Sequence, residues 1–242
     1  MPQWSCDSFI LILSGEENTN MRIRINQRLA ALILLGAAST ALAAGNPEAG
    51  EKKAAACIAC HGPDGNSPAL PPPTEQWPKL AGQLPEYLTS QMLDFKAGRR
   101  SNAQMSPQAQ AVAESDIADI AAFFAKQKVK PNEPGDKALI AQGEKLFFNG
   151  KGRPNLVAAC VGCHGLDGSG NRDWNKTMSS LPAVLAPAIG GQHASYVAAQ
   201  LKAYRDGSRR NERANVMRDI ARRLNDKDIA AVSEYVASLT RQ

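Results

Sequence analysis

Four of the five cysteines in the chain belong to two copies of one short motif, CIACH at residues 57–61 and CVGCH at residues 160–164. Two thiols three residues apart, followed directly by a histidine, can bond to the vinyl carbons of a porphyrin and direct an imidazole at its iron. This spacing, C-x-x-C-H, is the attachment motif of c-type haem. The sequence therefore predicts two covalently attached haem c groups. The residues that would hold them are Cys57, Cys60 and His61 in the first motif and Cys160, Cys163 and His164 in the second.

Two other chemistries use paired cysteines. A thioredoxin-like redox pair normally lies in a βαβ unit, and no strand-like alternation is visible in this sequence. A structural zinc site needs four ligands close together, which neither motif supplies alone. Repetition of the whole motif, histidine included, favours haem over both alternatives.

The iron of each haem has a sixth position that another residue must fill or leave open. A methionine gives a high-potential electron carrier, a histidine gives a lower potential, and an open position allows ligand binding or catalysis. Met105 and Met217 are favoured because each precedes an Asp-Ile-Ala segment by the same 11 residues. We expect both on irregular chain between two helices. The other candidates, which have no methionine or histidine at the matching place in the other half, are Met92, Met178 and His193.

The repeated motif is part of an internal duplication of a unit of about 100 residues, an ordinary domain size. Upstream of each motif, Gly50 answers Gly143. Downstream, PKLAGQ at 78–83 answers PAIGGQ at 187–192. The prolines that begin these segments either form simple turns or offer a carbonyl to the haem-binding histidine, because a metal-bound histidine usually donates its other N–H to an acceptor.

Apolar spacing predicts that helices position these residues. Asn225 followed by Asp228 predicts the start of the last helix, with the asparagine capping a backbone N–H. Each half is therefore predicted to be an all-α domain of short helices. The residues that form the matching apolar stripes are Ile117, Ile120, Ala121 and Phe124 in the first half and Ile229, Val232, Val236 and Leu239 in the second.

The N-terminal segment has the pattern of an export signal. Residues 21–43 run from arginines through an uncharged Leu/Ala-rich stretch to Ala41-Leu42-Ala43, which is the order of a secretory signal peptide. We predict cleavage after Ala43 and export to the periplasm. Residues 1–20 precede this signal and are interpreted as upstream translation. The mature chain then divides into an N-terminal haem c domain at 44–130, a linker at 131–136 and a C-terminal haem c domain at 137–242.

The 242 residues are 43% hydrophobic, 21% charged and 5% aromatic, a globular composition that excludes disordered and collagen-like chains. Outside the N-terminal segment, no apolar run approaches the roughly 20 residues of a membrane span. The net charge of +5 lies in the second half, much of it between residues 205 and 223. This segment is either a solvated helix face or a docking surface for an acidic redox partner or for anionic lipid, and it does not indicate nucleic-acid binding.

The chain resembles the cytochrome c4 family of dihaem class I cytochromes c. The resemblance covers nearly all of residues 46–240. It is carried by both CxxCHG motifs, the PKLAGQ and PAIGGQ segments, the stretch from Tyr87 to Arg100 with its second-half echo, and the Asp-Ile-Ala helices. It implies two tandem cytochrome-c-like domains related by a pseudo-twofold axis, with the haem propionates facing each other. It also implies that His61 pairs with Met105, that His164 pairs with Met217, and that Pro78 and Pro187 bond the histidines.

For function, the resemblance implies a periplasmic electron shuttle, loosely associated with the membrane, that serves redox proteins of a respiratory chain and leads toward a terminal oxidase. Two alternatives remain open. The chain is an electron-transfer subunit of a larger oxidoreductase, or it is a dihaem enzyme of the peroxidase or thiosulfate dehydrogenase type. An enzyme or a gas sensor needs an open iron, and neither half lacks its methionine, so the sequence favours an electron carrier that is not an enzyme.

Overall fold

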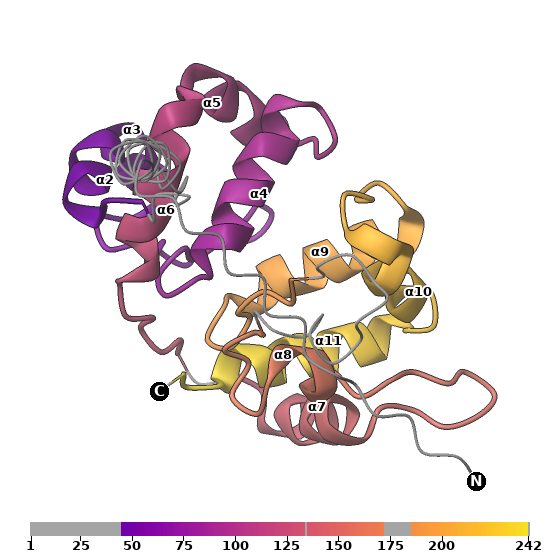
Figure 1. Ribbon diagram of the computed structural model, residues 1–242. Helices are drawn as coiled ribbons and strands as arrows, with labels where there is room; N and C mark the ends of the chain where they lie inside the picture. Colours follow the sequence, from indigo (N-terminus) through magenta and orange to yellow (C-terminus); the bar gives the residue numbers. More distant parts are fainter. Residues whose placement is uncertain (1–44, 134, 172–184, 242) are drawn as a thin grey trace, which may run out of the picture. The chain divides into compact units, whose positions relative to one another are not determined.

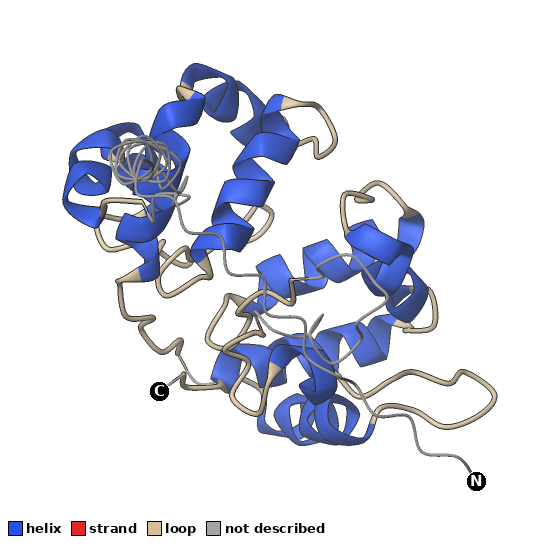
Figure 2. Cartoon of the chain, viewed as in Figure 1, coloured by secondary structure: helices blue, strands red, loops and turns tan. Residues whose placement is uncertain are grey.

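The computed structural model describes residues 45–133, 135–171 and 185–241 (Figure 1). Regular structure in these ranges is helical (Figure 2), apart from two isolated bridges that join Lys151 to Val157 and Asn171 to Ala186. The predicted upstream segment and signal peptide, together with Met178, lie outside the described residues. The helices of the first half are α2 (Pro47–Lys53), α3 (Ala55–His61), α4 (Pro85–Lys96), α5 (Met105–Ala111) and α6 (Glu114–Ala125). Those of the second half are α7 (Lys137–Asn149), α8 (Val161–His164), α9 (Ala194–Asp206), the short 3-10 turn η2 (Arg213–Asn215), α10 (Val216–Ala221) and α11 (Asp226–Ser238).

The two halves repeat one arrangement of helices. In the first half α2 and α4 both pack on α6, and α5 packs on α4. In the second half α7 and α9 both pack on α11, and α10 packs on α9. The motif helices α3 and α8 occupy the same place in this order. The prediction of two tandem all-α domains related by duplication is confirmed.

Side-chain caps fix where α2, α7 and α11 begin. Asn46 accepts hydrogen bonds from the backbone N–H groups of Glu48 and Ala49, with Pro47 at the first helical position. Asp136 caps α7 in the same manner. Asn225 and Asp228 form the predicted start of α11 as a reciprocal capping box, in which each side chain accepts from the other residue's backbone N–H. Each cap satisfies backbone donors that have no partner inside the helix.

Glycine allows the first helix of each half to cross the last one closely. A Cβ built on Gly50 would overlap the carbonyl oxygen of Asp119 on α6, and a Cβ built on Gly143 would overlap that of Ala231 on α11. Both glycines are therefore required by the close approach of two backbones. Their match in the sequence reflects the same helix crossing, made twice.

Aromatic and aliphatic side chains on these helices form one core in each half. The first core is formed by Ala54 together with three residues of α6, namely Ile120, Phe123 and Phe124. The second core is larger, and its ring pair Phe147–Tyr235 has centroids 5.2 Å apart. The predicted stripes of α6 and α11 face these cores, with Leu239 just past the end of its helix. The large side chains come from the helices that flank each motif.

The chain between α6 and α7 contacts both halves. Asn132 donates through its side-chain amide to the carbonyls of Gly191, Gln192 and Ala237 in the second half. Lys130 donates its backbone N–H to the Asn66 side chain in the first. The domain limits given from the sequence, with a linker at 131–136, stay a prediction.

Candidate haem-binding sites

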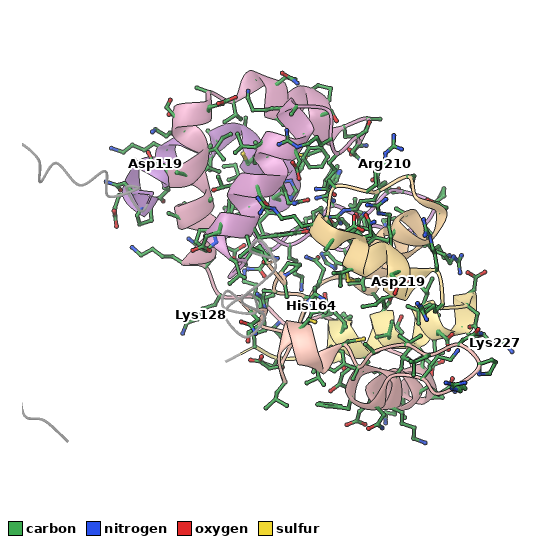
Figure 3. The ribbon with its side chains drawn as sticks, turned by 45° about the vertical axis from the view of Figure 1, so that its right-hand side comes forward. Asp119, Lys128, His164, Arg210, Asp219 and Lys227 are labelled. Atoms are coloured by element: carbon green, nitrogen blue, oxygen red, sulfur yellow. The ribbon has the colours of Figure 1, made fainter. Side chains whose placement is uncertain are left out.

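Each C-x-x-C-H motif ends a helix at its histidine. His61 is the last residue of α3 and His164 the last of α8 (Figure 3), and both are 8% exposed. The glycine that follows each histidine, Gly62 or Gly165, has a φ of 80°. Few residues other than glycine adopt this conformation, so the glycine lets the chain leave the helix directly after the histidine. The sequence thus places each imidazole at a helix end next to a sharp turn.

A proline carbonyl fixes both imidazole rings. Nδ1 of His61 lies 2.9 Å from the carbonyl oxygen of Pro78, and Nδ1 of His164 lies 2.9 Å from that of Pro187. A carbonyl only accepts, so Nδ1 carries the proton and Nε2 keeps the lone pair that can bind a metal. Burial lowers the pKa of both histidines, against a smaller opposing effect of the proline carbonyl. They therefore stay neutral, which is the state an axial ligand requires. The predicted acceptor role of these prolines is confirmed.

The four motif cysteines are free of disulfide bonds. Burial raises the pKa of Cys57 and Cys163, and it raises the pKa of Cys160 to about 11. Redox-active CxxC pairs have a lowered thiol pKa instead. This opposes the thioredoxin-like interpretation. Within the described ranges no cluster of three or more His, Cys, Asp or Glu side chains is arranged to hold a metal ion.

The predicted haem-binding residues line one continuous cavity of about 2270 Å³. Apolar side chains from both cores share that lining, among them Leu80, Phe124, Leu201 and Val236. An apolar cavity with thiols, imidazoles and thioethers along its wall fits the apolar ring and the iron of a haem. Both attachment motifs and both favoured methionines contribute, namely Cys57, Cys60, His61, Met105, Cys160, Cys163, His164 and Met217. The pairing of each histidine with its methionine stays a prediction.

The two methionines lie at the starts of helices, and the expectation of irregular chain was wrong. Met105 is the first residue of α5, and its N–H donates to the Asn102 side chain. Met217 is the second residue of α10, a helix that begins directly after two non-glycine residues with positive φ, Ala214 at 56° and Asn215 at 57°. The sequence signal was hidden because α5 and α10 have only 7 and 6 residues, too few to show an apolar period. A side-chain hydrogen bond therefore fixes the backbone at Met105, whereas a turn with positive φ precedes the helix that carries Met217.

Two arginines that the sequence analysis did not single out join the halves beside this cavity. Arg100 donates to the hydroxyl of Tyr196 and to the side chain of Gln200 in the second half. Arg209 donates to the equivalent residues of the first half, the hydroxyl of Tyr87 and the side chain of Gln91. Both arginines line the cavity and supply positive charge, which fits the carboxylates of haem propionates. Their common position two residues after the matched glycines 98 and 207 was the available signal.

Comparison with known proteins agrees with this geometry. The family model described as cytochrome c matches the chain twice, over residues 47–128 and 140–240. A cytochrome c4 of Pseudomonas aeruginosa is 44% identical over 217 residues, which cover 89% of this chain and all of the relative. The chain belongs to the cytochrome c4 family. It is accordingly an electron-transfer protein and not an enzyme.

Two further relatives bear on this cytochrome c4. The crystal structure of reduced recombinant cytochrome c4 from Pseudomonas stutzeri is 41% identical, covers 81% of this chain and all of the other, and superposes with a TM-score of 0.69. A thiosulfate dehydrogenase electron acceptor of Thiomonas intermedia is 34% identical over 88% of this chain and 91% of the relative. Relatives named for two different roles therefore match this chain over most of their length.

His193 joins the two halves of the chain. It stands directly before α9, is 7% exposed, and its Nε2 lies 3.0 Å from the carbonyl oxygen of Ser67. Burial, and the nearby charge of Lys79, lower its pKa. The burial of His193 against the other half depends on a residue 126 positions away, so the sequence does not show it.

The basic segment at 205–223 is less available for docking than the sequence suggested. Arg209 is buried, Arg205 pairs with Asp226, and Arg218 pairs with Glu212. Arg223 pairs with Asp219 on α10. Figure 3 labels the exposed Arg210, which remains available for a partner. Much of the local excess charge thus serves contacts within the protein. No helix in the described part of this cytochrome c4 is long and apolar enough to span a membrane.

Proposed function

We propose that this chain carries two covalently attached haem c groups and passes electrons between redox proteins of the periplasm, toward a terminal oxidase. Each haem would supply one iron that takes up and releases a single electron. The cysteines of each motif would hold the ring, and His61 with Met105 and His164 with Met217 would ligate the two irons. The observation that carries the proposal is the duplicated constellation along one cavity, in which both imidazoles are neutral and fixed by a proline carbonyl.

The chain's own groups suit electron transfer without bond making at the iron. Each proline carbonyl fixes its histidine ring and leaves Nε2 free of a proton. A methionine thioether as the second ligand would close the iron to other ligands. Burial of both histidines keeps water from competing for them. A haem held in this way would exchange electrons with partner proteins and would offer no iron position to a substrate.

The decisive experiment is the visible spectrum of the reduced, haem-loaded protein with and without carbon monoxide. The wild-type protein should contain two haems per chain and should not respond. Met105→Ala and Met217→Ala should each open one iron, so that carbon monoxide shifts half of the haem absorbance. Met92→Leu is the matched control, because leucine stands at this place in the second half. Response of the wild-type protein would contradict the proposed ligands and favour the enzyme or sensor interpretation.

A second candidate function has support from one comparison. Because a thiosulfate dehydrogenase electron acceptor is 34% identical over most of both chains, this protein is a candidate acceptor for electrons from such an enzyme. Stopped-flow reduction of the oxidised protein by a thiosulfate dehydrogenase, compared with oxidation of the reduced protein by oxidase-containing membranes, separates the two roles. Fast reduction of the protein by thiosulfate and the enzyme would support thiosulfate dehydrogenase as an electron donor. The absence of such reduction would exclude that enzyme as the donor.

The periplasmic location is part of the same proposal. Its support is the signal-peptide pattern of residues 21–43 and the cysteine motifs, since covalent haem attachment accompanies export. Edman sequencing of the protein recovered from the periplasm should begin at Ala44. Recovery of the whole chain from the cytoplasm would contradict both the location and the proposed cleavage.

A further inference from the structure

Each half of the protein grips the other with one buried glutamine. Gln83 accepts a hydrogen bond from the N–H of Ala188 at 2.9 Å and donates to the carbonyl of that residue at 2.7 Å. Gln192 does the same to Lys79, at 2.8 Å and 2.9 Å. Both glutamines are 8% exposed. The duplication thus yields two reciprocal clamps, each made by one side-chain amide on one backbone residue.

The gripped residues follow the two prolines that fix the haem-binding histidines. One peptide group joins Pro78 to Lys79, so its carbonyl oxygen accepts from His61 while its N–H donates to Gln192. The peptide group between Pro187 and Ala188 makes the equivalent pair of bonds, to His164 and to Gln83. Each histidine is therefore connected through a single peptide group to a glutamine of the opposite half.

The two hydrogen bonds on such a peptide strengthen each other. The peptide is a resonant unit, so an acceptor on its N–H moves electron density onto its oxygen and makes the carbonyl a better acceptor. Chains of hydrogen bonds polarise one another in this manner, and the effect is largest where the local dielectric is low. A stronger bond from the imidazole N–H raises the basicity of the ligating nitrogen.

We propose that each glutamine tunes the reduction potential of the haem in the opposite half. This rests on the proposed function, because it takes His61 and His164 as the iron ligands. Gln192 acts on the first haem through Lys79, Pro78 and His61. Gln83 acts on the second through Ala188, Pro187 and His164. A more basic imidazole favours the ferric iron, so each glutamine lowers the potential of the haem across the contact. Both are positioning residues, since they touch neither haem ligand directly.

Local contacts hold the glutamines rigid enough for this role. Oε1 of Gln83 also accepts from the N–H of Leu84 at 3.0 Å, and Oε1 of Gln192 accepts from that of His193 at 3.1 Å. These two residues are the N-caps of α4 and α9. Each clamp is thus tied to the start of the helix that carries the arginine-binding Tyr and Gln of its half. A change in how the two halves meet would reach both histidines by this route.

The test measures the potential of each haem separately. The dihaem wild-type protein and its Gln83→Met and Gln192→Met variants are titrated, and proton NMR follows the axial-methionine signals of the two haems. Gln83→Met should shift the ferric/ferrous equilibrium of the second haem toward the ferrous form by threefold or more and leave the first within twofold. Gln192→Met should shift the first haem toward the ferrous form by the same factor and leave the second haem within twofold. Gln110→Met is the control, because Gln110 bonds only within its own half, to the carbonyl of Lys96.

A conservative variant separates polarisation from loosening of the contact. Gln83→Glu keeps an acceptor for the N–H of Ala188, so the second haem should return to the wild-type potential or fall below it. Amide exchange of Ala188 and Lys79, measured on the same samples, should rise only in the variant that removes the corresponding clamp. Both variants are compared after circular dichroism shows wild-type helix content.

Each result either supports or overturns the inference. Shifts that cross between the halves, with reversal in Gln83→Glu, support it. Shifts confined to the mutated half, equal shifts of both haems, or unchanged potentials overturn it. The haem content and the carbon monoxide response of the wild-type protein are recorded first. If the wild-type protein lacks two haems or responds to carbon monoxide, the proposed function is wrong. If it has two haems and does not respond, but the glutamine variants do not shift the potential of the haem in the opposite half, only the glutamine proposal is wrong.

Discussion

Arg100 and Arg209 hold equivalent positions on opposite sides of the contact between the two halves. Each donates to a tyrosine hydroxyl and a glutamine of the other half. Each also covers an aromatic ring of its own half, Phe95 at 4.7 Å and Tyr204 at 4.6 Å from the ring centroid. The contact therefore obeys the same duplication as the helices. Arg209, at 7% exposed, is deeply buried.

Replacement of this arginine should weaken the contact between the halves. Arg209→Met leaves the hydroxyl of Tyr87 without its charged donor and leaves the side-chain oxygens of Gln91 and Gln200 with Arg100 as their remaining charged donor. A hydrogen bond to a charged group contributes about 1.5–3 kcal/mol to stability, so we expect a loss of about 2–3 kcal/mol in the free energy of unfolding. Urea denaturation of the haem-loaded protein measures it. Arg210→Met, at the exposed neighbouring position, should stay within about 0.5 kcal/mol. Equal effects of the two variants would contradict the network.

The glycines at the helix crossings predict a second stability difference. Gly50→Ala or Gly143→Ala places a methyl group against a backbone carbonyl that cannot move aside, so we expect a loss of about 1–3 kcal/mol in the free energy of unfolding. Gly162→Ala is the control, because nothing lies within 4 Å of its added Cβ and the first motif has Ala59 there. Thermal unfolding of the three variants checks the order. A loss in the control as large as that in Gly50→Ala would show that motif packing, and not the crossing, sets the effect.

Much of the fold could be predicted because the chain repeats itself. The apolar stripes of Ile117–Phe124 and Ile229–Val236 repeat at helical spacing, and their helices form as expected. The histidine–proline contact followed from a chemical requirement of metal ligands. The duplication also supplied the match between Gly50 and Gly143, although only the structure shows that both sit under a backbone carbonyl.

What remained hidden depends on contacts between residues far apart in the chain. Gln83 meets Ala188 and His193 meets Ser67 across more than 100 residues, and no local pattern records such pairs. The arginines of 205–223 were interpreted as a docking surface because their partners, such as Asp226 and Tyr87, are not evident from the sequence. Short helices such as α10 escaped because periodicity needs more turns than they have.

The strained approach to Met217 predicts a stabilising substitution. Ala214 has a φ of 56°, a conformation that costs residues with a Cβ about 1–2 kcal/mol and glycine almost nothing. Part of the gain in Ala214→Gly is offset by the greater freedom of glycine in the unfolded chain. We expect a rise of about 0.5–1 kcal/mol in the free energy of unfolding, measured by urea denaturation. Ala111→Gly, at the helical end of α5, is the control and should be destabilising. A loss in both would contradict the strained conformation.

Charge on the surface of the second half predicts a kinetic effect. Arg210 is exposed, and such residues act mainly on the rate at which partners meet. Electron transfer from the reduced protein to an acidic partner should slow as ionic strength rises. In Arg210→Glu the rate at low salt should fall several-fold, and the rate at high salt should change little. Stopped-flow measurements over a salt series provide the test. A rate that does not depend on salt would remove the docking role.

Lys79 predicts a dependence of stability on pH. Its side chain is 5% exposed and donates to the carbonyl of Lys130 at 2.7 Å. Burial, and the nearby charge of Arg241, lower the pKa of Lys79 to about 8. Because its pKa is higher in the unfolded chain, the unfolded state binds more protons between these two values. Stability from this group therefore rises with pH over that interval, and below about pH 8 the full cost of the buried charge remains.

The Lys79→Met variant isolates this contribution. Between about pH 7 and pH 9 the wild-type protein should gain about 1 kcal/mol in the free energy of unfolding relative to the variant. Removal of the charge should also raise the pKa of His193, which Lys79 helps to lower, and NMR titration of the imidazole measures that change. The two readouts are independent, since one follows the lysine and the other its neighbour. Only a desolvated charge close to His193 produces both effects. If wild type and Lys79→Met depended on pH in the same way, and if the pKa of His193 were the same in both, the ammonium group of Lys79 would therefore be hydrated.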